Sequence, residues 1–322
     1  MPIEYRFADS GDMEALDRQW EEESGWGTQQ LAQWFLAAPF GEPRVVMASD
    51  RLTGALLGQF RFMPTQVSVD GHVVRATRPF GTIITKTMRE AVRSVNPLRQ
   101  PAVAMYLFAT KALRADGVQL IHMVPDPRWE RLLRMFPFFQ TGKFRLWSLK
   151  LPLSAPLHLP DGYTSGPLPA WDARVDRLWD VASSLHGCSV VRNARTLAWK
   201  FSVGTYAITA IERGGELVGV VGSQRKGDRQ WLICDLLAAD AGDSLRATLT
   251  AACQVADEQS VMPGDRPLHK VAVLASPVLE PVVRALGFSP DSYESVIVVH
   301  VLDHAIPASA VAPARWYVSA ND

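Results

Sequence analysis

The sequence contains only three cysteines in 322 residues, scattered at positions 188, 234 and 253. This number and spacing exclude a disulfide framework and a cysteine-based metal cluster, so no metal site is expected. Neither sign of charge is in excess, since 33 Lys and Arg residues balance 33 Asp and Glu residues. The balance argues against a nucleic-acid partner and against attraction to an anionic membrane surface.

Long apolar runs are also missing. No uninterrupted apolar stretch reaches the length of a membrane span, and the first residues contain no apolar signal-peptide core. We therefore expect no membrane span and a cytoplasmic location. Because 48% of the residues are hydrophobic, the chain is long enough and apolar enough to form two cores.

Residues 95–106 run from a proline-marked turn directly into an apolar helical pattern. The first backbone N–H groups of a helix have no partner within the helix, and the helix dipole adds positive charge there, so an anion is stabilised. Arg99 would add a fixed positive charge, while the small side chains of Ala102 and Ala104 leave room for a ligand. An ordinary loop before an amphipathic helix is the alternative interpretation.

Hydrophobic periodicity and turn signals predict the elements of the first half. Asp70-Gly71 is a strong hairpin signal between two of the strands. The expected elements are helices around 13–20 and 29–35, strands at 44–48, 55–62, 66–69, 73–76 and 81–85, a helix from 103 to 115, a strand at 118–124, a helix at 127–135 and a strand at 143–151.

A proline-rich segment at 152–169 has no periodicity and is expected to be a linker. Beyond it the same order of elements returns. Residues 127–138 align with 277–288 at an offset of 277 − 127 = 150 residues, with Pro, Glu, two aliphatic residues, Arg and Phe in matching positions. We therefore expect two copies of one fold, residues 1–151 and 170–305, followed by a tail at 306–322.

The order Arg99-x-x-Ala102-x-Ala104 resembles the Arg/Gln-x-x-Gly-x-Gly/Ala loop of the GCN5-related N-acetyltransferase (GNAT) superfamily, with Ala in place of the first Gly. The element order of the first half is similar to that family, and residues 286–288, Leu-Gly-Phe, resemble the end of its fourth helix. Residues 192–206 resemble a segment of bacterial two-copy GNAT proteins. The resemblance implies an α/β (α+β) protein of two GNAT-like domains, each a mixed, mostly antiparallel sheet flanked by helices.

The resemblance implies an N-acyltransferase that moves an acyl group from acyl-CoA, or from an acyl carrier protein, to a small amine by direct attack on the thioester. The donor is expected in the first copy, because Asp240 and Asp243 at the matching place of the second copy would repel a pyrophosphate. The expected cofactor-binding residues are Arg99, Gln100, Ala102, Val103, Ala104 and Tyr106.

The general acid and base are less well defined. Many GNAT enzymes use a Tyr near the end of the fourth helix, but the matching positions here hold Leu133 and Val283. His122 is the expected base, because its strand lies next to the thioester in the family and imidazole titrates near neutral pH. Glu90 and Asp126 are further candidates. A core histidine and solvated carboxylates are the alternative interpretations.

Two other functions stay open. One is a catalytically silent GNAT-like protein that binds a ligand or serves in assembly. The other is an aminoacyl-tRNA-dependent transferase of the two-copy FemABX type, against which the balanced charge argues. A homodimer is also compatible with the sequence.

Overall fold

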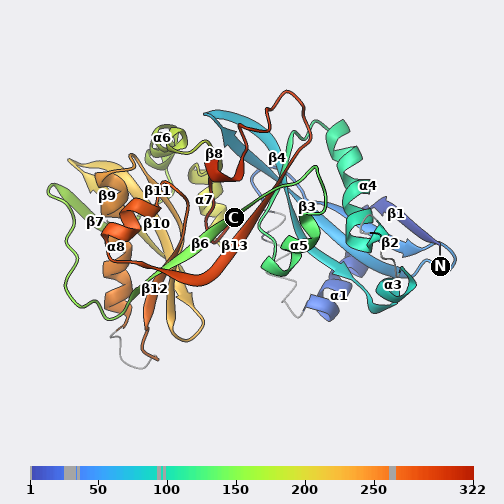
Figure 1. The fold of residues 1–322 in the computed structure, drawn as a ribbon, viewed down its shortest axis with the longest axis horizontal. Coiled ribbons are helices and arrows are strands. Elements are labelled where there is room, and N and C mark those ends of the chain that lie inside the picture. The colour runs from blue at the N-terminus through green and yellow to red at the C-terminus, as the bar shows by residue number, and fades with distance from the viewer. Residues whose placement is uncertain (1, 25–33, 35–36, 93–95, 97–98, 261–265) are drawn as a thin grey trace.

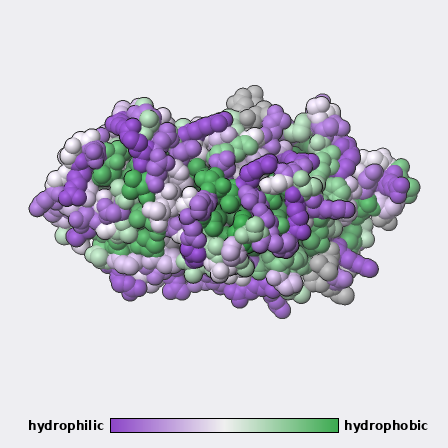
Figure 2. All heavy atoms as spheres, turned by 90° about the horizontal axis from the view of Figure 1, so that it is seen from above, coloured by the Kyte–Doolittle hydropathy of each residue, from purple (hydrophilic) through white to green (hydrophobic). Residues whose placement is uncertain are grey.

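One sheet of fourteen strands runs through the part of the chain that the structure, a computed structural model, describes. The described residues are 2–24, 34, 37–92, 96, 99–260 and 266–322. Helices flank the sheet toward both ends of an elongated molecule (Figure 1). Seen from above, hydrophobic residues reach the surface near the middle of the molecule, between margins that are mostly hydrophilic (Figure 2).

The first half contributes the strands and helices around the right-hand end in Figure 1. They are β1 (Ile3–Phe7), α1 (Met13–Ser24), β2 (Arg44–Asp50), β3 (Leu56–Val69), β4 (His72–Ile84), α3 (Lys86–Ala91), α4 (Pro101–Ala115), β5 (Leu120–Met123), the 3₁₀ helix η2 (Pro127–Trp129), α5 (Glu130–Leu133) and β6 (Gln140–Lys150).

The second half forms the left-hand end in Figure 1. Its elements are β7 (Tyr163–Pro167), α6 (Ala173–Ala182), η3 (Ser183–Leu185), β8 (Cys188–Val190), α7 (Ala194–Lys200), β9 (Ala207–Arg213), β10 (Glu216–Lys226), β11 (Gln230–Ala238), α8 (Asp243–Ser260), β12 (Lys270–Ala275), α9 (Glu280–Ala285), β13 (Ser289–Val301), η4 (Pro313–Arg315) and β14 (Trp316–Tyr317).

The predicted hairpin forms at Asp70-Gly71, whose φ angles of 49° and 81° are those of a tight primed turn. The strands on either side are longer than expected, because β3 and β4 each join two of the predicted segments. The continuation through Pro64 has a physical reason. Pro64 lies where β3 changes its outer neighbour, from β2 up to Phe62 to β8 from Val67, so its missing N–H removes no hydrogen bond on that side.

The last strands of the two halves are exchanged. β6, from the first half, pairs antiparallel with β12, matching Lys150 with Lys270. β13, from the second half, pairs antiparallel with β5, matching Val298 with Met123. The two strands also pair with each other, so they join the halves at the centre of the sheet (Figure 1).

Two segments are more structured than the sequence suggests. The expected linker at 152–169 includes β7, which pairs with β9 at the edge of the sheet. Only Tyr163 of this strand is buried, so no alternating pattern marks it. The expected tail at 306–322 includes β14, which pairs with β8, and Trp316 in it is 1% exposed.

The helix expected at 29–35 lies outside the described residues, except for Trp34. Its indole ring stacks on that of Trp199 with ring centroids 4.3 Å apart. Each indole N–H donates to the other residue's carbonyl, at 3.0 and 2.8 Å. This paired contact joins the N-terminal part of the chain to α7.

Candidate functional site

A cleft opens where β4 and β5 separate. The two strands run parallel and pair only at Ala76 with Leu120 and Thr77 with Ile121, after which they diverge. Beyond that point lies a cavity of about 320 Å³. It is lined by residues 78–82 of β4, residues 123–126 at and after the end of β5, the first turns of α4, and residues of η2 and α5.

A β-bulge shapes the β4 wall of this cleft. Gln59 pairs with Ile83 and Arg61 with Phe80, so β4 carries one residue more than β3 over this interval. Gly81 lies in the bulge with a φ of 57°, a conformation that favours glycine. A Cβ on Gly81 would lie 2.0 Å from the Trp20 ring, so glycine also allows close packing here. The bulge turns the backbone of the strand toward the cavity.

The N-terminus of α4 closes one end of the cavity. Pro101 occupies the first turn, where its missing N–H costs no helical hydrogen bond, and the N-cap residue Gln100 makes no side-chain capping hydrogen bond. Ala102 and Val103 line the cavity with small or medium apolar side chains. Backbone N–H groups and the positive end of the helix dipole therefore meet the cavity at a place suited to an anion.

Solved structures share the overall fold over most of the chain. A probable N-acyltransferase from Enterococcus faecalis V583 gives a TM-score of 0.69 at 10% identity, covering 94% of this chain and 73% of that chain. A GCN5-related N-acetyltransferase from Anabaena variabilis gives 0.68 at 13% identity, with 94% and 73% covered. The chain has the GNAT fold. This confirms the expected α/β class with a mixed, mostly antiparallel sheet flanked by helices.

A third similar structure is the N-myristoyltransferase from Saccharomyces cerevisiae with bound myristoyl-CoA. It gives a TM-score of 0.57 at 12% identity, and the match covers 93% of this chain and 84% of that chain. At the level of sequence, no protein-family model and no curated protein matches the chain. The GNAT fold therefore rests on structural similarity, and the chemistry has to be argued from the site.

Within this GNAT fold, three of the six residues expected to bind the cofactor line the cavity. Ala102, Val103 and Tyr106 line it. Arg99 and Gln100 directly precede α4, and the Arg99 side chain is exposed. Ala104 is on α4 but does not line the cavity.

Tyr106 also links the cavity to the second half of the chain. Its hydroxyl lies 2.9 Å from Nδ1 of His300 on β13, and the tautomer of His300 decides which atom donates. Burial raises the pKa of Tyr106 well above its usual value and lowers the pKa of His300 to about 4, so both groups are neutral at pH 7. Leu133, at the position of the usual GNAT tyrosine, lines the same cavity. The sequence could not reveal His300, which lies 194 residues from Tyr106.

His122 lies outside the cavity lining. Its neighbours Ile121 and Met123 pack in the core beneath α4, whereas alternation along β5 turns His122 to the opposite face. There its Nε2 lies 3.1 Å from the Thr65 hydroxyl. Burial, together with the positive charge of Arg78, lowers the pKa of His122 to about 3. The imidazole is therefore a neutral core group at pH 7, and its role as a base stays a prediction that this placement does not favour.

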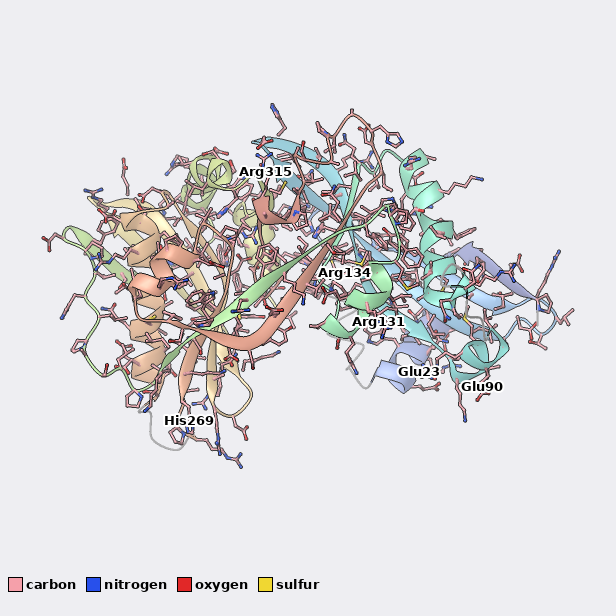
Figure 3. All side chains as sticks on the ribbon, in the orientation of Figure 1. Glu23, Glu90, Arg131, Arg134, His269 and Arg315 are labelled. Atoms are coloured by element: carbon pink, nitrogen blue, oxygen red, sulfur yellow. The ribbon has the colours of Figure 1, made fainter. Side chains whose placement is uncertain are left out.

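The two carboxylate candidates are already paired. Asp126 lines the cavity, but its two oxygens accept from the guanidinium of Arg128 at 2.9 and 2.8 Å. These hydrogen bonds lower the pKa of Asp126 to about 2, which makes it a weak base. Glu90 lies on α3 at the end of the molecule away from the second half (Figure 3), 3.9 Å from Lys86, and does not line the cavity.

The corresponding place in the second half is filled. β11 and β12 pair in parallel over four matched positions, from Gln230 to Ile233, and the space beyond them amounts to about 10 Å³. The start of α8 is capped from within the chain, because Asp240 accepts hydrogen bonds from the N–H and the hydroxyl of Ser244 at 3.2 and 2.5 Å. A carboxylate thus occupies the end of α8 that corresponds to the start of α4.

The segment that resembles two-copy GNAT proteins holds a buried ion cluster. Arg192 and Lys200 each pair with both Asp235 and Asp322, at 2.5 to 2.8 Å, and the four side chains are at most 4% exposed. Each charge has partners of opposite sign on two sides, which offsets the cost of burial. The segment therefore ties α7 to β11 and to the residues after β14 through paired charges.

Neither a metal centre nor a membrane helix is seen in the described part of the chain. Its His, Cys, Asp and Glu side chains form no group of three that could hold a metal ion. None of its helices is long and apolar enough to cross a membrane.

Proposed function

We propose that this protein transfers an acyl group from a coenzyme A thioester to a small amine, in the cleft between β4 and β5. The observation that carries the proposal is the divergence of these strands at the N-terminus of α4, which provides a cavity of about 320 Å³ beside a helix end suited to phosphate. The myristoyl-CoA complex of a protein with the same fold supports a coenzyme A thioester as donor.

The first half is the better place for the donor. Its helix start at Ala102 borders an open cavity, whereas the corresponding helix start in the second half is occupied by Asp240. Phosphates would meet backbone N–H groups and Arg99 in the first half but a carboxylate in the second. A phosphopantetheine arm on an acyl carrier protein would offer the same thioester, so both carriers belong to the proposal.

In the proposed reaction the neutral amine attacks the thioester carbonyl carbon, the C–N bond forms and the C–S bond breaks. The departing thiolate takes a proton from the Tyr106 hydroxyl, which is protonated at neutral pH and regains a proton through His300 or water. The cleft orients the two reactants, which lowers the entropic part of the barrier. The amine's own proton passes to water, because Asp126 is held by Arg128.

A catalytically silent binding protein is the second candidate function. The observation that favours it is the set of ionisable side chains among the described cavity residues, which consists of Arg78, Tyr106 and Asp126. None of these is an unpaired base with a pKa near 7. A protein that only binds a coenzyme A thioester would need no such base.

Binding of coenzyme A tests the donor site. We expect coenzyme A and acetyl-CoA to raise the melting temperature saturably, because a ligand that binds only the folded state stabilises it by mass action. The change Arg99→Glu should weaken this binding about tenfold, as it reverses a charge beside the phosphates. Lys111→Glu is the matched control, since Lys111 is exposed on α4, the helix that Arg99 precedes, and lies outside the cavity lining.

The outcomes separate the candidates. Binding that Arg99→Glu weakens and Lys111→Glu does not, followed by amine-dependent release of the thiol from acetyl-CoA, supports the transferase. Binding without thiol release from any amine tested supports the silent protein. No shift with millimolar coenzyme A, acetyl-CoA or acyl-phosphopantetheine would contradict the donor site.

A further inference from the structure

Within the described part of the chain, the guanidinium of Arg78 in the cleft has no counter-ion. Arg78 of β4 lines the cavity and is partly buried. Among the described residues it makes no hydrogen bond and no ion pair. Its guanidinium carbon lies 6.0 Å from the centroid of the Phe80 ring. A buried guanidinium is costly unless an anion or several acceptors surround it.

Asp322, the acid whose charge acts on Arg78, is already paired. The charge of Asp322 acts on Arg78 electrostatically. However, its carboxylate oxygens accept from Arg192 at 2.5 Å, from Lys200 at 2.6 Å and from the backbone N–H of Ser319 at 2.8 Å. Asp126, which does line the cleft, is held by Arg128. The Arg78 charge is therefore left for a group that enters the cavity.

The position of Arg78 shows which part of a substrate would reach it. It directly follows Thr77, the last residue of β4 that pairs with β5, so it stands where the cleft begins to open. It affects the pKa of His122, which faces away from α4. The phosphates of a donor would lie at the start of α4, whereas Arg78 is on the opposite face of the sheet. A group that pairs with Arg78 therefore belongs to the part of the substrates around the thioester. It is part of either the acceptor or the far end of the acyl group.

We propose that Arg78 binds a carboxylate of the substrate, so that the transferase acts on an amino acid or another amine with a carboxylate, or transfers a dicarboxylic acyl group. The planar guanidinium matches a carboxylate through two parallel hydrogen bonds. This inference rests on the proposed function for its reaction, while the binding site itself can be tested without turnover.

Matched ligand pairs test the proposal. Phenylalanine is compared with phenylalaninamide for the acceptor, and succinyl-CoA with acetyl-CoA for the acyl group, using calorimetric titration of the full chain. The variants are Arg78→Gln and the control Arg75→Gln, which removes the same charge from an exposed position on the same strand outside the cavity lining. The wild type and Arg75→Gln should bind the carboxylate member of one pair about tenfold to hundredfold more tightly, and Arg78→Gln should lose this preference.

The pair that shows the preference identifies the source of the carboxylate. Equal affinities within both pairs for the wild type would overturn the proposal, as would a preference that Arg78→Gln retains. A loss of coenzyme A binding in Arg78→Gln would also contradict it, because Arg78 would then hold a phosphate. Failure of the wild type to bind coenzyme A contradicts the donor site alone, since phenylalanine and its amide are titrated without it.

Discussion

At the scale of single residues, His122 is buried, His186 and His300 are half-buried, and all three are neutral at pH 7. Burial lowers the pKa of His122 to about 3 and the pKa values of His186 and His300 to about 4. Each must lose its water to reach its place in the fold, and each forms a hydrogen bond or a ring contact there. Their charge state therefore couples the stability of the fold to pH.

We expect stability to fall as the pH is lowered below 6.5. The folded pKa of His122 lies below its unfolded value, so the unfolded state binds more protons between about pH 3 and pH 6.5. This histidine alone should cost about 2 kcal/mol between pH 6.5 and pH 5, at about 1.4 kcal/mol per pH unit. Urea denaturation at both pH values measures the loss.

Two substitutions check the source of this pH dependence. His122→Gln should reduce the loss of unfolding free energy between the two pH values, whatever it does to stability at pH 7. His158→Gln, at an exposed position, should leave the loss unchanged. An equal loss in the wild type and His122→Gln would show that His122 is not responsible.

The sequence placed the residues at the start of α4 better than it placed His122. The start of α4 follows from a local pattern of turn, charge and small side chains, and Ala102, Val103 and Tyr106 do line the cavity. A strand, by contrast, has two faces, and nothing local distinguishes them when both are buried, as in β5. His122 could therefore be placed on its strand but not on a face of the sheet.

At the scale of elements, the bulge in β4 ties the cleft to the packing of α1. Gly81 combines a positive φ with close contact to the Trp20 ring, while Gly54 has a φ of 72° and open space around it. A comparison of substitutions at these two glycines therefore distinguishes the cost of backbone strain from the cost of steric contact.

We expect Gly81→Ala to destabilise the protein more than Gly54→Ala. Both changes force a left-handed conformation on alanine, at about 1–2 kcal/mol. Only Gly81→Ala also displaces Trp20, which adds about 1–3 kcal/mol and should weaken coenzyme A binding by shifting the cleft wall. Urea denaturation and coenzyme A titration measure the two effects. Equal losses of stability with unchanged binding would show that the bulge does not shape the site.

Most elements with a clear period were predictable, and the misses have physical reasons. β1 and β7 are edge strands of five residues, and β8 and β14 are shorter still, so they offer too little alternation to detect. β3 and β4 were each predicted in two pieces, and the two pieces of β3 lie on either side of Pro64. Whether a strand can continue through Pro64 depends on which strand lies beside it, and the local sequence does not contain that information.

At the scale of the whole molecule, the 150-residue repeat predicted two related halves but not how they join. The strands β6 and β13 each end their own half in sequence, yet each pairs across the boundary. A strand paired within its own half and a strand paired across the boundary show the same alternating pattern, so hydrophobic periodicity does not distinguish the two pairings. The exchange has a consequence for the site, because it brings His300 of β13 next to Tyr106.

The described residues that line the cleft all belong to the first half. The start of α4, where we propose that the phosphates bind, lies at one end of the cleft, while the face that carries Arg78 lies toward the ion cluster of Arg192 and Asp322. Donor and acceptor are therefore expected to approach from different sides and meet where β4 and β5 separate.

A crystal structure with bound coenzyme A tests this account most directly. We predict that the pantetheine arm lies between residues 78–82 and 123–126, with the pyrophosphate at the first turn of α4. The matching region of the second half, capped by Asp240, should hold no ligand. Coenzyme A bound at α8, or outside the β4–β5 cleft, would contradict the central claim.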